Sequence, residues 1–142
     1  MAGLRVFILT FAALLVAAPG AMAEILVIVN TDNPTTELSS RQIVDLYMGR
    51  NQSFPNGESA FPLDLSPDSS LRGQFYRSLT DKSVAQVNAY WARLLFTGRA
   101  TPPRVMADSP TVMRAVRENR GAIGYIDSAD LEQGVKVVGR VD

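Results

Sequence analysis

Ile25-Leu26-Val27-Ile28-Val29 (residues 25–29) is an unbroken run of branched apolar side chains. Such a run is typical of a β-strand that is buried on both faces, because a strand with one face in water alternates apolar and polar residues. From this strand onward, the patterns follow the order strand, helix, strand, three helices and two strands. This alternation predicts an α/β fold with a small mixed central sheet flanked by about four helices.

The remaining strands have weaker patterns. In the second strand Phe61, Leu63 and Leu65 alternate with Ala60, Pro62 and Asp64. The proline favours an edge position, because it cannot donate a hydrogen bond to a neighbouring strand. Residues 122–126 and 135–138 are predicted to be the last two strands, and residues 99–108 a proline-containing connector.

Start signals mark the helices. Ser39 with Gln42 and Ser83 with Gln86 have the capping-box spacing, in which each side chain bonds the other residue's backbone. Ser109-Pro110 is typical of an N-cap followed by proline at the first helical position. Another helix follows residues 66–70, which contain three serines.

The N-terminus has the pattern of a secretory signal. One arginine is followed by an apolar stretch at residues 6–18, and the segment ends in Ala21-Met22-Ala23. A basic start, a short apolar region and a small-x-small end are typical of a signal peptide cleaved before Glu24. The apolar stretch is shorter than the roughly 20 residues that cross a bilayer. We therefore expect a cleaved signal peptide (1–23), one domain (24–142), and a periplasmic or secreted protein.

Composition excludes several classes of function. The 14 Lys and Arg balance the 14 Asp and Glu, and loss of Arg5 with the signal leaves 13 − 14 = −1. Without a basic excess, nucleic acid or an anionic membrane is not the expected partner. The sequence has no cysteine and no histidine, so Ser-His-Asp triads, Cys-His dyads and His-ligated zinc are excluded. We predict a protein that is not an enzyme and holds no cofactor or metal.

Residues 66–72 form the candidate binding site. Ser69 and Ser70 open a helix, where free backbone N–H groups and the helix dipole favour an anion, and Arg72 adds a fork of donors. The alternative is that Asp68 or Ser69 only caps the helix and Arg72 is a solvated surface residue. Asn30 and Thr31 follow the first strand and are predicted to line the same cleft, unless they form an ordinary turn.

Four segments in order resemble phosphate ABC transporter substrate-binding proteins. They are LSSRQIVDLYMGR (38–50), FPNG (54–57), SPDSSLRGQFY (66–76) and RENRGAIGYID (117–127). The resemblance implies the fold of one lobe, the second, of a two-lobed family, with phosphate as the ligand. The family's phosphate loop has Arg-x-x-x-Ser-Gly-Thr. Laying Ser69 on its serine puts Leu65 on its arginine, so Arg72 would have to replace that arginine.

Two functions are therefore expected. In the first, the exported lobe binds a small oxyanion weakly, phosphate above all, in phosphate uptake or sensing, because a lone lobe covers only one side of a ligand. A homodimer or an envelope protein would then complete the cleft. In the second, the fold is kept, the ligand site is lost, and a surface docks onto a partner in the cell envelope. No stable membrane insertion is expected after cleavage.

Overall fold

The computed structural model describes residue 3 and residues 23–142, so the predicted signal peptide lies outside the described residues except for Gly3 and Ala23. Among the described residues no helix has the length and apolarity needed to cross a membrane. The elements are β1 (Ile25–Asn30), α1 (Ser40–Tyr47), β2 (Phe61–Leu65), α2 (Ser70–Thr80), α3 (Val84–Phe96), β3 (Arg104–Met106), α4 (Ser109–Glu118), β4 (Ala122–Asp127), the 3-10 turn η1 (Ser128–Asp130) and β5 (Val135–Val141).

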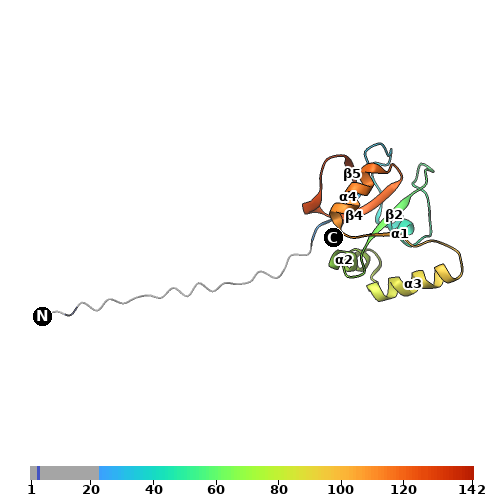
Figure 1. The fold of residues 1–142 in the computed structure, drawn as a ribbon, viewed down its shortest axis with the longest axis horizontal. Coiled ribbons are helices and arrows are strands. Elements are labelled where there is room, and N and C mark those ends of the chain that lie inside the picture. Colours follow the sequence, from blue (N-terminus) through green and yellow to red (C-terminus); the bar gives the residue numbers. More distant parts are fainter. Residues whose placement is uncertain (1–2, 4–22) are drawn as a thin grey trace.

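The five strands form one mixed sheet in the order β3-β2-β4-β1-β5. Strand β2 runs parallel to both β3 and β4, and β1 runs antiparallel to both β4 and β5. Every residue of β1 is buried, as its apolar sequence predicted. The predicted α/β class, mixed sheet and four helices are confirmed (Figure 1).

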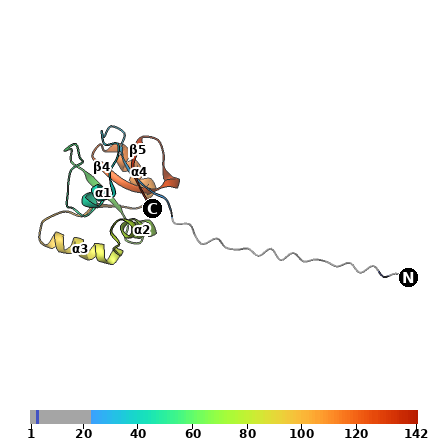
Figure 2. The ribbon, with the colours of Figure 1, turned by 180° about the vertical axis from the view of Figure 1, so that it is seen from behind.

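Helices cover both faces of the sheet. Gly124 of β4 faces Val112 of α4, and the next residue, Tyr125, stacks on Phe75 of α2 with ring centroids 3.8 Å apart. Because neighbouring residues of a strand point to opposite faces, α4 and α2 lie on opposite sides of the sheet. Helix α1 lies on the α2 side, since the ring of its Tyr47 packs edge-on against Phe75. Helix α3 packs outside α2, at the edge of the domain in both views (Figures 1 and 2).

Two predictions about the sheet are wrong. The connector at residues 99–108 contains the short strand β3, which makes β2 an internal strand. Pro62 is tolerated there because β3 begins to pair only at Leu63, so the proline has a strand on one side only, where it lies opposite Ile123 of β4. Its missing N–H therefore leaves no gap in the β2–β3 ladder.

The capping signals in the sequence predict the starts of helices α1 and α3 correctly. Both predicted capping boxes are present, at Ser39 with Gln42 and at Ser83 with Gln86. Helix α4 differs, because its N-cap is Asp108 and not Ser109. One carboxylate oxygen of Asp108 accepts from both the backbone N–H of Thr111 at 2.9 Å and its hydroxyl at 2.6 Å, so the residue before Ser109 caps the helix.

Candidate functional site

A cavity of about 760 Å³ opens at the C-terminal ends of β2 and β4. The segment between β2 and α2 forms one wall, and the starts of α4 and η1 form the other. We call it the Ser69 cavity; it is lined by Ala23, Leu65, Ser66, Asp68, Ser69, Ser70, Leu71, Gln74, Ala107, Asp108, Ser109, Pro110, Asp127 and Asp130. Ser69 and Ser70 thus lie at the C-terminal edge of parallel strands, where ligands bind in open α/β sheets.

Hydrogen-bond donors remain free at the start of α2. Ser69 is the N-cap, and its hydroxyl oxygen accepts from the N–H of Arg72 at 3.4 Å. The N–H groups of Ser70 and Leu71 have no acceptor within the described part of the chain. The hydroxyls of both serines can also donate, so four donors lie at one wall of the cavity. The capping role predicted for Ser69 as the alternative is therefore present, and it leaves these donors available.

The side chains around these donors are acidic. Asp68, Asp108, Asp127 and Asp130 line the cavity, and no arginine or lysine among the described residues does. Hydrogen bonds from Thr111 hold the pKa of Asp108 below its ordinary value, so this carboxylate is charged at neutral pH. Asp127 accepts from the N–H of Ala129 at 3.0 Å. Together these carboxylates give the cavity a negative potential that a fully ionised anion would have to overcome.

Arg72 does not reach this cavity. Its side chain is buried and lies under α2, with Nε 3.3 Å from the Asp64 carboxylate and Nη2 donating to Asn88 at 3.0 Å. Its guanidinium carbon also lies 5.1 Å from the centre of the Tyr76 ring. Both sequence-based interpretations placed it wrongly, since it is neither at the predicted anion site nor in solvent. The sequence held a signal, because Arg72 precedes Phe75 by three residues on the buried face of α2.

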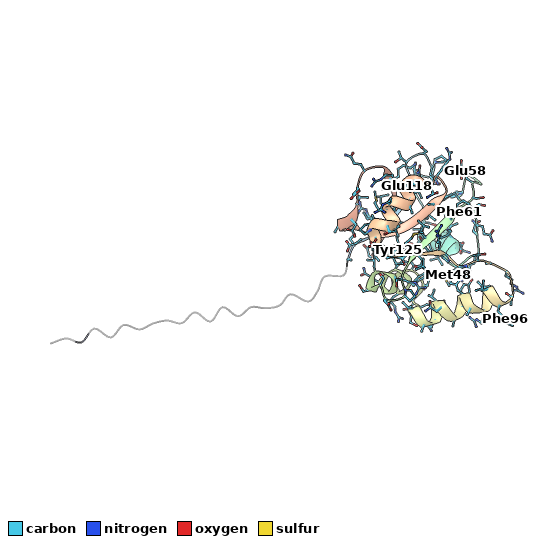
Figure 3. All side chains as sticks on the ribbon, viewed as in Figure 1. Met48, Glu58, Phe61, Phe96, Glu118 and Tyr125 are labelled. Atoms are coloured by element: carbon cyan, nitrogen blue, oxygen red, sulfur yellow. The ribbon has the colours of Figure 1, made fainter. Side chains whose placement is uncertain are left out.

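Asp64 is the centre of a buried polar network that the sequence did not reveal. Tyr76 donates to one carboxylate oxygen at 2.6 Å, while Tyr125 and the N–H of Leu65 donate to the other. Burial, and then the charge of Asp64, raise the pKa of both tyrosines far above the ordinary value, so they stay protonated donors. Figure 3 shows Tyr125 inside the domain. The network ties β2, β4 and α2 together beneath the Ser69 cavity.

Asn30 and Thr31 lie at the opposite end of the strands from the Ser69 cavity. Strand β1 runs antiparallel to β4, so its C-terminal end lies beside the start of β4, far from the Ser69 cavity. Asn30 donates to the carbonyls of Val116 and Arg117, both at 2.9 Å, and so caps the C-terminus of α4. The prediction of one shared cleft is wrong, because it assumed that β1 runs parallel to its neighbours.

A second cavity, of about 610 Å³, lies at the other end of β2. Residues 100–104, the end of α1 and the start of β2 enclose it, and Phe61 and Pro102 are among its lining residues. Arg104 is its one lining residue with a charged side chain among those described. Its walls carry no helix N-terminus, so it offers an anion fewer donors than the Ser69 cavity does.

Comparison with solved structures decides the class of fold. A protein from Clostridium perfringens described as a phosphate ABC transporter substrate-binding protein, solved with bound phosphate, matches with a TM-score of 0.66 at 21% identity, over 82% of this chain and 45% of its own. An ABC-type phosphate transport receptor from Vibrio cholerae matches with a TM-score of 0.65 at 21% identity, over 82% and 46%. PstS from Borrelia burgdorferi matches with a TM-score of 0.58 at 12% identity, over 82% and 47%.

The chain has the fold of one lobe of a phosphate-binding protein. It spans less than half the length of the solved structures that it matches. The resemblance seen in the four sequence segments is thus confirmed at the level of the fold. No protein-family profile matches the sequence, and no curated protein sequence matches it either. At this low identity, the comparison shows a shared fold, and the ligand has to be argued from the site.

Proposed function

We propose that this binding-protein lobe binds a small oxyanion, above all phosphate, weakly and without catalysis at the Ser69 cavity. We further propose that it acts in phosphate uptake or sensing after export to the periplasm. One observation carries the proposal: the cavity exposes the start of α2, with Ser69 and Ser70, in a fold shared with a protein that was solved with bound phosphate.

The walls favour an oxyanion that carries its own proton. Donors at Ser70 and Leu71 can bind unprotonated oxygens, as at other helix starts. The aspartates that line the cavity can only accept a hydrogen bond, and a P–OH group can donate one to them. Sulfate has the same shape but no proton at neutral pH, so it meets the same carboxylates as a repelled anion. The cavity therefore supports phosphate better than sulfate.

Weak binding follows from the size of the chain. Small-molecule sites bury most of their ligand, and a single lobe covers one side of it. A second copy of the chain or an envelope protein closing over the Ser69 cavity would raise the affinity by burying the other side. A dissociation constant in the millimolar range fits an uncovered site of this kind, since 1 mM corresponds to about −4.1 kcal/mol.

The test is a thermal melt with and without phosphate, with sulfate at the same ionic strength. Phosphate at about ten times its dissociation constant stabilises by roughly 1.4 kcal/mol, or about 5 °C in a domain of this size. We expect Ser70→Ala to reduce the shift, and Ser78→Ala, an exposed position on the same helix, to leave it unchanged. A shift of equal size for phosphate, sulfate and the Ser70→Ala variant would contradict the proposal.

The second candidate, an envelope docking protein, is favoured by the outer face of α3. Ala85, Ala89 and Ala92 are exposed and repeat with helical spacing, and Phe96 continues the row with 94% of its surface exposed. Figure 3 shows Phe96 at the far end of α3, pointing away from the domain. An exposed phenylalanine beside small residues is typical of a contact surface. In cross-linking with envelope extract, Phe96→Ser should abolish a specific adduct if this surface docks.

A further inference from the structure

The Ser69 cavity lacks the positive charge that an anion site usually has. Among the described residues that line it, only helix dipoles and neutral donors offset the negative charge of its four aspartates. Arg72, the nearest guanidinium on α2, is occupied by Asp64 below the cavity. Because charge-assisted hydrogen bonds are about twice as strong as neutral ones, the missing cation is a large deficit for phosphate.

The chain enters the domain at this cavity. Ala23 is one of the lining residues, and its carbonyl accepts from the side-chain amide of Gln74. Glu24 is fixed beside it, since its carbonyl accepts from the N–H of Ser128 at 2.9 Å and its carboxylate pairs with Arg140. The next residue, Ile25, lies opposite Asp127 in the β1–β4 register. The peptide bond between residues 23 and 24 is therefore held at the acidic wall.

The predicted signal-peptide cleavage breaks this same bond. Water adds to the Ala23 carbonyl, the C–N bond breaks, Ala23 leaves with a carboxylate, and Glu24 keeps the amine. An α-amine has an ordinary pKa of about 7.7–8.0, so it is mostly an ammonium at neutral pH. We propose that cleavage places the α-ammonium of Glu24 among the carboxylates of the Ser69 cavity, where it supplies the site's positive charge. The inference rests on the proposed phosphate function and on the predicted cleavage.

Other charged groups at this end of the chain do not replace the ammonium. Arg140 of β5 is paired with the Glu24 carboxylate, so that its charge is already balanced. Asp127 and Asp130 belong to the β4–η1 wall and Asp68 to the segment before α2, and all three face the cavity. Cleavage also removes the acceptor of Gln74, whose amide becomes free to bind a ligand oxygen. Processing would thus add two donors and one charge to the same wall.

The first experiment removes the positive charge of the amine. Residues 24–142 contain every described helix and strand, and their described side-chain hydrogen bonds lose only the Gln74–Ala23 bond, so this chain is expected to fold alone. The variant Glu24→Gln, made so that the substituted position is its first residue, is studied before and after enzymatic cyclisation, in which the amine displaces ammonia from the side-chain amide. The cyclised form has a neutral lactam in place of the ammonium.

We expect the open form to bind phosphate roughly tenfold more tightly than the cyclised form, the effect of one charged hydrogen bond. Equal affinity in the two forms would overturn the inference and leave the proposed function standing. Isothermal titration with inorganic phosphate measures both constants. Both forms lack the Glu24–Arg140 pair, so the loss of this pair affects both affinities and does not account for a difference between them.

A second measurement needs no phosphate. In the unmodified 24–142 chain, an NMR titration should give the α-ammonium a pKa above its ordinary range, because neighbouring carboxylates favour the charged form. Asp127→Asn and Asp130→Asn should each lower it. An ordinary pKa that neither variant changes would overturn the inference. If phosphate binds to no form while this pKa is raised, the proposed function fails and the placement of the ammonium is supported.

Discussion

The guanidinium of Arg72 and the carboxylate of Asp64 form a buried ion pair, with Nε 3.3 Å from Oδ2. Two tyrosine hydroxyls and one backbone N–H complete the shell of the carboxylate. The pair joins α2 to β2 directly below the Ser69 cavity. It therefore holds the start of α2, with Ser69 and Ser70, in place against the sheet. Arg72 therefore supports the candidate site without touching a ligand.

Replacing Arg72 should destabilise the domain. Arg72→Met keeps most of the side-chain volume but leaves Asp64 buried without its cation, which costs about 3 kcal/mol and lowers the melting temperature by roughly 10 °C. Asp64→Asn in the same chain should recover part of this loss, because the amide carries no unpaired charge. Thermal unfolding of the two single variants and the double variant gives the coupling energy. Strictly additive losses would show that the two groups do not interact.

The buried tyrosines predict how stability depends on high pH. The pKa values of Tyr47, Tyr76 and Tyr125 are raised in the folded protein, chiefly by burial, above the usual 10.0. Folding therefore retains protons that the unfolded chain releases, so this contribution is intact below pH 10 and is lost as the pH rises above it. Tyrosinate absorbance should rise for these three residues only as the protein unfolds, measured against far-ultraviolet circular dichroism. Ionisation of all tyrosines before unfolding would contradict this.

Gly124 tests the contact between the sheet and α4. A Cβ atom at this position would lie 2.4 Å from Cγ1 of Val112, closer than real atoms approach. Gly124→Ala should cost about 1–3 kcal/mol, the usual range for overfilling a packed core. Val112→Ala in the same chain should restore part of this by clearing the space. Urea unfolding measures both, and a neutral Gly124→Ala variant would mean that α4 moves away freely.

Asp68 tests the basis of the proposed anion selectivity. Asp68→Asn removes one negative charge from the wall next to Ser69 and keeps the side-chain shape. We expect the difference between the phosphate and sulfate affinities to shrink, because sulfate loses a repulsive neighbour. Asp81→Asn, which changes the charge at an exposed position at the end of α2, is the control. Titration calorimetry with each anion checks the effect, and an unchanged ratio in Asp68→Asn would contradict it.

Local signals were enough to predict most of the elements. The apolar run of β1 and the two capping boxes were correct because each depends on neighbouring residues alone. Strand β3 was missed because Arg104 and Val105 are exposed, so no face of this short segment carries an apolar pattern. Its strand structure comes from pairing with β2, which is a contact between distant parts of the chain.

The candidate site was harder to predict because it depends on strand direction and on which faces are covered. Asn30 was placed at the wrong edge, since nothing in the local sequence shows that β1 runs against β4. Asp64 alternates with apolar residues in β2, a pattern that does not show that its side chain is buried. It is buried because α2 covers that face of the sheet as well, and its polar partners come from residues 12 and 61 positions away.

The position of β1 in the sheet determines when the domain can form. The first strand of the chain lies between β4 and β5, the last two strands to be made. Its neighbours are about a hundred residues away in sequence, which gives the sheet a high contact order and delays pairing until the C-terminus is complete. A chain still emerging from the ribosome would therefore carry β1 unpaired, which is the unfolded condition that the proposed export would require.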